Sequence, residues 1–176
     1  LRKIFSEHTG LNVFIENDAN AAVVAEHLFG VMRQTRDFIF IYAGVGVGGG
    51  LFLNGKLYRG HNGYAGEIGH ISTVSEGTGE LCFCGNPGCW ETTINQRAVI
   101  RRVEACLKNG SSSLIPNLML EKNESSLSVE LIKQAADAGD EAALGSFVEV
   151  GRAMGQGIAG IVNIFNPEKV VIGGTL

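Results

Sequence analysis

The sequence predicts an α/β protein, because short apolar runs typical of buried strands alternate with segments of helical periodicity. Residues 37–44 (DFIFIYAG) and residues 169–174 (KVVIGG) are the clearest of these runs. Residues 140–165 have the longest helical pattern, and Asn166-Pro167, a pair that ends a helix, leads from them into the second run. Buried strands beside helices in this order favour a sheet covered by helices.

The first third of the chain has the signals of two helices, two strands and a hairpin. Asn54-Gly55 is the strongest of these signals, since Asn-Gly favours the tight turn between two antiparallel strands. The expected elements are, in order, the end of a helix over 1–8 that stops at Gly10, a short buried strand over 12–17, a helix over 18–30 with Gly30 as its C-terminal cap, a strand over 37–44, and a hairpin over 49–58.

The remainder is predicted to be mainly helical after a long loop. Glycines interrupt residues 60–90, and only residues 68–72 have the pattern of a short strand there. The elements expected after this loop are a helix over 91–108, a linker over 109–117, a helix over 128–138, the long helix over 140–165 and a final strand over 169–174.

Composition is that of one ordinary globular lobe. Of 176 residues, 45% are hydrophobic and 18% are charged, which is enough for one substantial core. The net charge of −4 and the lack of a dense basic cluster argue against a surface that reads nucleic acid. No run approaches the ~18 apolar residues that span a bilayer, so we expect a cytoplasmic protein with no signal peptide and no membrane partner. We also expect residues 1–176 to be a single α/β lobe, a fragment of a longer chain, because both ends coincide with predicted elements.

Three of the four cysteines stand together in CFCGNPGCWE, at Cys82, Cys84 and Cys89. Spacing this tight is a poor fit to disulfide geometry, and the Cys-x-x-Cys of a thioredoxin-type redox pair is absent from the sequence. Zinc needs four nitrogen or sulfur donors, and His70 is the candidate fourth ligand. A closed site of three cysteines and one histidine predicts a structural zinc. Cys106, which is alone in a helical segment, is expected to be an ordinary buried thiol.

The glycine run AGVGVGGG (43–50) contains a G-x-G-x-x-G pattern at Gly44, Gly46 and Gly49. As a dinucleotide fingerprint it is weak, because that motif must open a helix and a hairpin is expected here. Backbone N–H groups in such a turn can bind a phosphate. A tight turn where two strands cross closely explains the glycines equally well, and both interpretations stay open.

Two acidic stretches provide candidate ligand-binding side chains. In ENDAN (16–20), Asn17 or Asp18 could simply cap the following helix. Carboxylates and amides crowded at the tip of a strand are also what the paired hydroxyls of a sugar require. In GYAGEIGH (63–70), Glu67 precedes His70 by three residues, so a metal that holds this loop would also hold Glu67 in position.

The segments ENDANAA, AGVGVGGGL, GHNGYAGEIGH and CFCGNPGCWE, taken in this order, resemble the ROK family of sugar kinases and sugar-responsive repressors. The H…C-x-C-G-x-x-G-C-x-E arrangement is the most specific part, and VVIGG near the end also fits. The resemblance implies an actin-like ATPase (ribonuclease H-like) fold of two lobes, with this chain covering most of the C-terminal lobe and carrying a zinc-stapled loop.

The resemblance also implies roles for individual residues. It matches Asn17, Asp18, Glu67 and His70 to sugar contacts, and in a kinase Asp18 would be the general base that takes the proton of the attacking hydroxyl. The implied zinc ligands are His70, Cys82, Cys84 and Cys89. The loop that faces ATP phosphate in the kinases corresponds to Gly44, Gly46, Gly48 and Gly49.

One departure favours the repressor branch. Kinase members usually have Thr where this sequence has Val45, which has no hydroxyl to offer a phosphate. Trp90 in GCWE also resembles the xylose- and N-acetylglucosamine-responsive repressors. We therefore expect the sugar-binding, effector-sensing domain of a ROK-type transcriptional regulator of carbohydrate metabolism. The alternative is the C-terminal lobe of an ATP-dependent sugar kinase of the glucokinase or N-acetylhexosamine kinase type.

The two branches share some expectations and differ in others. Both predict a monosaccharide or amino sugar as ligand, a structural Zn²⁺ and a homo-oligomer. A regulator would contact DNA only through an N-terminal helix-turn-helix outside this sequence, and only a kinase would use ATP and Mg²⁺. The chain by itself is not expected to phosphorylate a sugar. A third hypothesis, an inactive lobe used for dimerisation, rests on the glycines of the long helix: Gly151, Gly155, Gly157 and Gly160.

Overall fold

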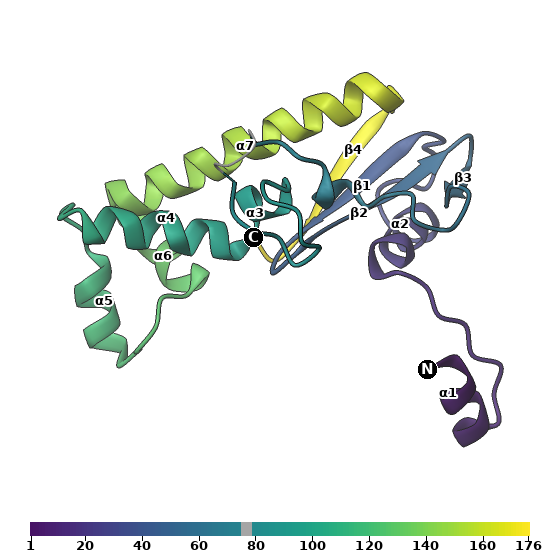
Figure 1. The fold of residues 1–176 in the computed structure, drawn as a ribbon, viewed down its shortest axis with the longest axis horizontal. Coiled ribbons are helices and arrows are strands. Elements are labelled where there is room, and N and C mark those ends of the chain that lie inside the picture. Colours follow the sequence, from purple (N-terminus) through teal and green to yellow (C-terminus); the bar gives the residue numbers. More distant parts are fainter. Residues whose placement is uncertain (75–78) are drawn as a thin grey trace.

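A computed structural model describes residues 1–74 and 79–176, and its centre is a four-stranded mixed sheet (Figure 1). The strand order is β3 (Lys56–Tyr58), β2 (Val47–Leu53), β1 (Phe38–Ala43) and β4 (Lys169–Gly174). The first three strands form an antiparallel meander, whereas β4 runs parallel to β1. The predicted α/β class is confirmed, with a mixed sheet.

The hairpin between β2 and β3 forms at the predicted place. Asn54 and Gly55 both have positive φ, 55° and 74°, which is the backbone that the favoured two-residue turn requires. The Asn54 N–H also donates to Asp37 Oδ1 at 2.7 Å, which ties the turn to the start of β1. Leu53 and Lys56 are therefore paired across the turn, as the Asn-Gly signal predicts.

The side chains of each strand alternate between the two faces of the sheet, so both faces carry apolar side chains. Helices cover both of them. Helix α2 (Asp18–Leu28) lies on one face and α7 (Glu141–Phe165) on the other (Figure 1). The face toward α2 buries one cluster: Val23, Met32, Phe38, Phe40 and Phe52. The opposite face contributes Ile39, Ile41 and Leu51 to the main core, which continues into α3 (Glu91–Ile94), α4 (Gln96–Lys108) and α7.

The helices away from the sheet form a small bundle, in which α5 (Ile115–Lys122) and α6 (Val129–Asp137) join α4 and α7. Polar side chains cap three of these helices at their N-termini. Asn95 caps α4, Ser128 caps α6 and Asp140 caps α7, each by accepting a backbone N–H three residues later. The last two caps agree with the predicted starts of their helices.

The predicted strand over 12–17 is wrong. These residues form an extended, exposed connection between α1 (Arg2–Thr9) and α2, and Figure 1 shows α1 well away from the sheet. A strand needs a neighbouring backbone to pair with, and no strand of the described residues pairs with this segment. Phe14, 82% exposed, consequently has nothing to pack on in the body of the lobe.

Smaller corrections concern the ends of elements. The expected strand over 68–72 is a 3₁₀ helix, η1 (Ile68–His70), followed by a single bridge between Ser72 and Cys89. The helix expected over 91–108 is broken at Asn95, whose extended backbone lets it cap α4. The linker over 109–117 already contains the start of α5, and α2 ends at Leu28, before Gly30. Among the described residues, no helix is both long and apolar enough to cross a membrane.

Candidate metal centre and adjoining polar cleft

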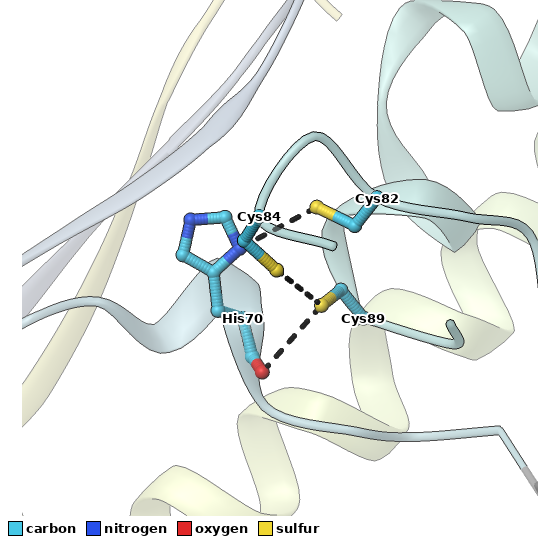
Figure 2. Close-up of side chains that lie close together, drawn as sticks. All are labelled: His70, Cys82, Cys84 and Cys89. Carbon is cyan, nitrogen blue, oxygen red and sulfur yellow. Dashed lines mark hydrogen bonds between the residues drawn. The ribbon is translucent and has the colours of Figure 1, made fainter. Parts of the chain in front are cut away.

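The four predicted metal ligands come together from the end of η1, which supplies His70, and from the loop that follows it, which supplies the three cysteines. Figure 2 shows the side chains of His70, Cys82, Cys84 and Cys89 converging, and their ligand atoms all lie within 4.8 Å of one another. Gly85 and Gly88 have φ of 90° and 81°, so they make the tight turns that bring the cysteines to one side. Asn86 holds the turn by donating from Nδ2 to Ser72 Oγ at 2.9 Å.

The spacing of these ligand atoms fits a tetrahedral metal. With Zn–S near 2.3 Å and Zn–N near 2.1 Å, the edges of a zinc tetrahedron are about 3.6–3.8 Å long. The Sγ atoms of Cys84 and Cys89 are 3.5 Å apart, and His70 Nδ1 is 3.5 Å from Cys82 Sγ. Two of the six separations thus already lie close to those that a bound zinc would impose, and none of the six exceeds 4.8 Å.

The thiols of this cluster differ in how readily they ionise. Burial raises the pKa of the Cys82 thiol to about 11. The backbone hydrogen bond from Asn86 lowers the pKa of Cys84, which is exposed. A bound metal cation would favour the thiolate form of all three cysteines, because its positive charge stabilises the negative sulfur.

His70 faces both the cysteines and a carboxylate. Its Nδ1 lies toward Cys82, and its Nε2 is 3.8 Å from Glu67 Oε2. A carboxylate behind a ligating histidine orients the ring and raises its basicity. Fixing His70 in the cluster therefore also restricts Glu67.

A polar cleft of about 370 Å³ lies next to this loop, between the start of α2 and the turn that leads into β2. Three segments remote in sequence supply its carboxylates: Asp18, Glu67 and Glu91. The remaining residues around it are Asn17, Tyr42, Val45, Gly46, Val47 and Gly48. The structure thus brings Asn17, Asp18 and Glu67 to one cleft and leaves His70 behind Glu67.

Asn17 and Asp18 each keep part of the side chain free at the cleft. Asn17 caps α2 by accepting the Asn20 N–H on Oδ1 at 3.1 Å, and Asp18 Oδ1 accepts the Ala19 N–H at 2.8 Å. Within residues 1–74 and 79–176, no protein group is hydrogen-bonded to Asn17 Nδ2 or Asp18 Oδ2. The helix-cap interpretation is correct for Asn17, but capping uses only its oxygen.

The glycines of the run have different surroundings. Gly46 and Gly48 line the cleft, whereas Gly44 and Gly49 do not. A Cβ on Gly49 would collide with Ile68, and a Cβ on Gly50 would collide with Val23. Gly49 and Gly50 therefore serve close packing, but they let η1 and α2 pack onto β2 rather than marking a crossing of two strands.

Glu91 is the cleft residue that the sequence reasoning missed. Its Oε2 accepts the Val47 N–H at 2.8 Å, and its Oε1 lies 3.6 Å from Cys82 Sγ. It thus connects the turn before β2 with the cysteine cluster. The signal was present, since Glu91 follows the last cysteine of the cluster by two positions.

These features define a mixed α/β domain with a candidate metal centre at the edge of a carboxylate-lined cleft. The chain belongs to the ROK family, whose family model matches residues 1–176. It is 36% identical to the xylose repressor of Caldicellulosiruptor bescii over 98% of this chain and 42% of that protein. The predicted resemblance is therefore confirmed.

Solved structures from both branches of the family are similar to this chain. One is a ROK family glucokinase from Streptomyces griseus in complex with glucose and AMPPNP, with a TM-score of 0.87 and 36% identity over 99% of this chain and 55% of that one. Another is a ROK family transcriptional regulator, a homologue of the Escherichia coli MLC protein, with a TM-score of 0.84 and 36% identity over 99% of this chain and 42% of that one. The chain thus spans about half or less of the relatives that it matches.

Proposed function

We propose that this chain is the sugar-binding, effector-sensing lobe of a ROK-type transcriptional regulator of carbohydrate metabolism. The observation that carries the proposal is the convergence of Asn17, Asp18 and Glu67, joined by Glu91, on one cleft. Amide and carboxylate groups can pair with the adjacent hydroxyls of a monosaccharide or an amino sugar. The similarity to a xylose repressor over almost the whole chain supports a sugar as the ligand.

The lobe is, in this proposal, most of the C-terminal half of a two-lobed protein with an actin-like ATPase (ribonuclease H-like) fold. The chain matches only about half of the length of its relatives in both branches, which supports a longer full-length protein. Contact with DNA then belongs to an N-terminal helix-turn-helix outside residues 1–176, in keeping with the net charge of −4. The full-length regulator is proposed to act as a homo-oligomer.

A structural zinc held by His70, Cys82, Cys84 and Cys89 completes the proposal. The donor set and the separations of its atoms support zinc over magnesium or calcium, which prefer oxygen ligands. Four protein donors close the coordination sphere, so the metal would fix the loop and take no part in a reaction. Through His70 the metal would also hold Glu67. Glu67 and His70 are both proposed sugar contacts as well.

The alternative function is that of an ATP-dependent sugar kinase lobe. The observation in its favour is that Gly46 and Gly48 line the same cleft as Asp18, so a phosphate and a sugar hydroxyl could meet there. Asp18 would then act as the general base, and ATP with Mg²⁺ would be needed. Val45, 80% exposed beside these glycines, presents no side-chain donor to a phosphate, which favours the regulator.

Two assays on the full-length protein test this function. For a regulator, fluorescence anisotropy should show binding to DNA from upstream of its own operon, and one of glucose, xylose, N-acetylglucosamine or N-acetylmannosamine should change that affinity. A coupled assay with ATP and the same sugars should show no turnover at ordinary enzyme rates, ~1 s⁻¹ or more. Turnover at such a rate, without any DNA affinity, would establish the kinase instead.

A further inference from the structure

The exposed segment in front of α2 is tied to the body of the lobe by one ion pair, Glu16–Arg59. Arg59 stands 43 residues further along, just after β3, and its Nε donates to Glu16 Oε2 at 3.2 Å while its Nη2 donates to the same oxygen. Within the described part of the chain, residues 1–17 make no other hydrogen bond or ion pair to residues beyond α2. This pair thus ties the segment to the lobe at the point where the segment meets the helix.

The second oxygen of the Glu16 carboxylate is also occupied. Oε1 accepts the Asn17 N–H at 3.1 Å and the Asn20 Nδ2–H at 3.1 Å. Asn20 is almost fully buried, so this hydrogen bond reaches into the packed first turn of α2. With both oxygens engaged by protein donors, Glu16 is an internal anchor, although it stands beside the two cleft residues.

The Glu16 carboxylate is hydrogen-bonded to the backbone directly before the residues that face the cleft. Glu16 holds the N–H of Asn17, and Asn17 and Asp18 follow directly. On the other side, the first turn of α2 rests on β2, where Ala19 packs against Gly48 and Gly50. Helix packing fixes Ala19, and the first turn of α2 holds Asn17 through hydrogen bonds to its backbone oxygen and its Oδ1. The residues before Asn17 pair with no strand in the described chain, which leaves Glu16 as the side chain that ties them to the lobe.

We propose that Arg59 is a positioning residue for the sugar site, which through Glu16 fixes the direction in which Asn17 and Asp18 point into the cleft. This inference rests on the sugar-binding function proposed above. A ligand site whose supporting residues are lost moves out of its productive geometry, and small displacements have large effects on binding. An exposed ion pair contributes little to global stability, so its loss should appear in ligand affinity and hardly in unfolding.

The test is calorimetric titration of the full-length protein with glucose, xylose and N-acetylglucosamine, using the sugar that the parent binds most tightly. Arg59→Gln and Glu16→Gln should each weaken binding about tenfold. The double variant should be no weaker than either single variant, because both act through one pair. Arg59→Lys should restore only part of the affinity, since it keeps the charge but loses the paired donors of the guanidinium.

Lys133→Gln is the matched control, because it removes another exposed ion pair, Lys133–Asp137 on α6, remote from the cleft. It should leave affinity unchanged, and all variants should keep the parent's unfolding midpoint and metal content. If Arg59→Gln binds as tightly as the parent while Asp18→Ala does not, the positioning role is overturned and the sugar site stands. Additive losses in the double variant would also overturn it. A parent protein that binds none of the three sugars overturns the inference together with the proposed function.

Discussion

Cys89 is the cluster residue most enclosed by the surrounding loop. Its side chain is fully buried, and its Sγ lies 3.5 Å from both Cys84 Sγ and Asn86 Nδ2. We expect Cys89→Ser to reduce bound zinc from about one per chain to almost none, because three remaining donors cannot close a structural site. The free energy of unfolding should fall as well, since metal binding and folding of such a loop are coupled. Elemental analysis of protein purified without added metal checks the first effect, and urea unfolding checks the second.

Cys106→Ser is the matched control for this substitution. Cys106 lies half-buried on α4, outside the cluster, so its loss should leave the zinc content unchanged. A parent protein that contains no zinc, with Cys82 and Cys84 joined in a disulfide, would contradict the account.

Sequence reasoning was strongest where chemistry restricts residue types. The ligand set was predictable because zinc needs a small choice of donors at short spacing, and the structure brings the four predicted donors together. Glu91 was missed because a single carboxylate at the start of a helix has a common structural explanation, stabilisation of the helix N-terminus. Its position between the cluster and the turn before β2 emerges only in three dimensions.

Among the helices, α7 packs closely on Trp90 at a single glycine. Trp90 is fully buried, its Nε1 donates to Ala153 O at 2.9 Å, and a Cβ on Gly157 would collide with its ring. Gly157→Ala should therefore lower the free energy of unfolding by about 1–3 kcal/mol, measured by urea denaturation. Gly155→Ala is the control, since a Cβ there meets nothing within 4 Å and the better helix propensity should stabilise by up to about 1 kcal/mol. Equal effects of the two substitutions would contradict this packing.

The N-terminus of α7 predicts a pH dependence. Burial raises the pKa of Asp140, but hydrogen bonds, first among them that from the Ala143 N–H, outweigh burial and lower the pKa overall. The same carboxylate accepts the Leu114 N–H at 2.6 Å, which ties α5 to α7. A carboxyl with a lowered folded pKa stabilises the protein above its unfolded pKa of about 3.9, and this stabilisation is lost as the pH falls toward the folded pKa.

Asp140→Ala should thus lower the free energy of unfolding by about 1–2 kcal/mol near neutral pH, and its difference from the parent should shrink below about pH 4. Asn95→Ala is the control, because Asn95 caps α4 with a neutral amide. Its loss should cost about 1 kcal/mol at every pH. Thermal unfolding between neutral and acidic pH measures both. A difference for Asp140→Ala that stays constant across this range would show that its charge plays no part.

The elements were predictable where local signals agree with packing. The Asn-Gly turn and the starts of α6 and α7 follow from residues that act within four positions of themselves. The segment 12–17 was mistaken for a strand because pairing depends on a partner that local sequence does not reveal. Helix α5 was missed because a serine-rich stretch and Pro116 suggest a linker, although proline is favoured in the first turn of a helix.

The lobe as a unit places the candidate metal centre and the polar cleft side by side. Two carboxylates connect them, since Glu67 stands behind His70 and Glu91 lies between Cys82 and Val47. Zinc binding and sugar binding should therefore be coupled, and by linkage each should raise the affinity for the other, so that loss of the metal weakens sugar binding. Loss of a sugar contact should leave the metal in place, because neither Asp18 nor Glu67 belongs to the ligand set.

The central claim, a sugar site formed by the cleft, is tested most directly by calorimetric titration of the full-length protein and its Asp18→Ala and Glu67→Ala variants. Glucose, xylose, N-acetylglucosamine and N-acetylmannosamine form the panel. Each lost charged hydrogen bond is worth about 1.5–3 kcal/mol, so each variant should bind the best sugar roughly tenfold to a hundredfold more weakly, with fold and zinc content intact. Glu121→Ala, which removes an exposed carboxylate on α5, should bind like the parent. If the Asp18 and Glu67 variants bind that sugar as tightly as the parent, the cleft is not the sugar site and Asp18 serves only the start of α2.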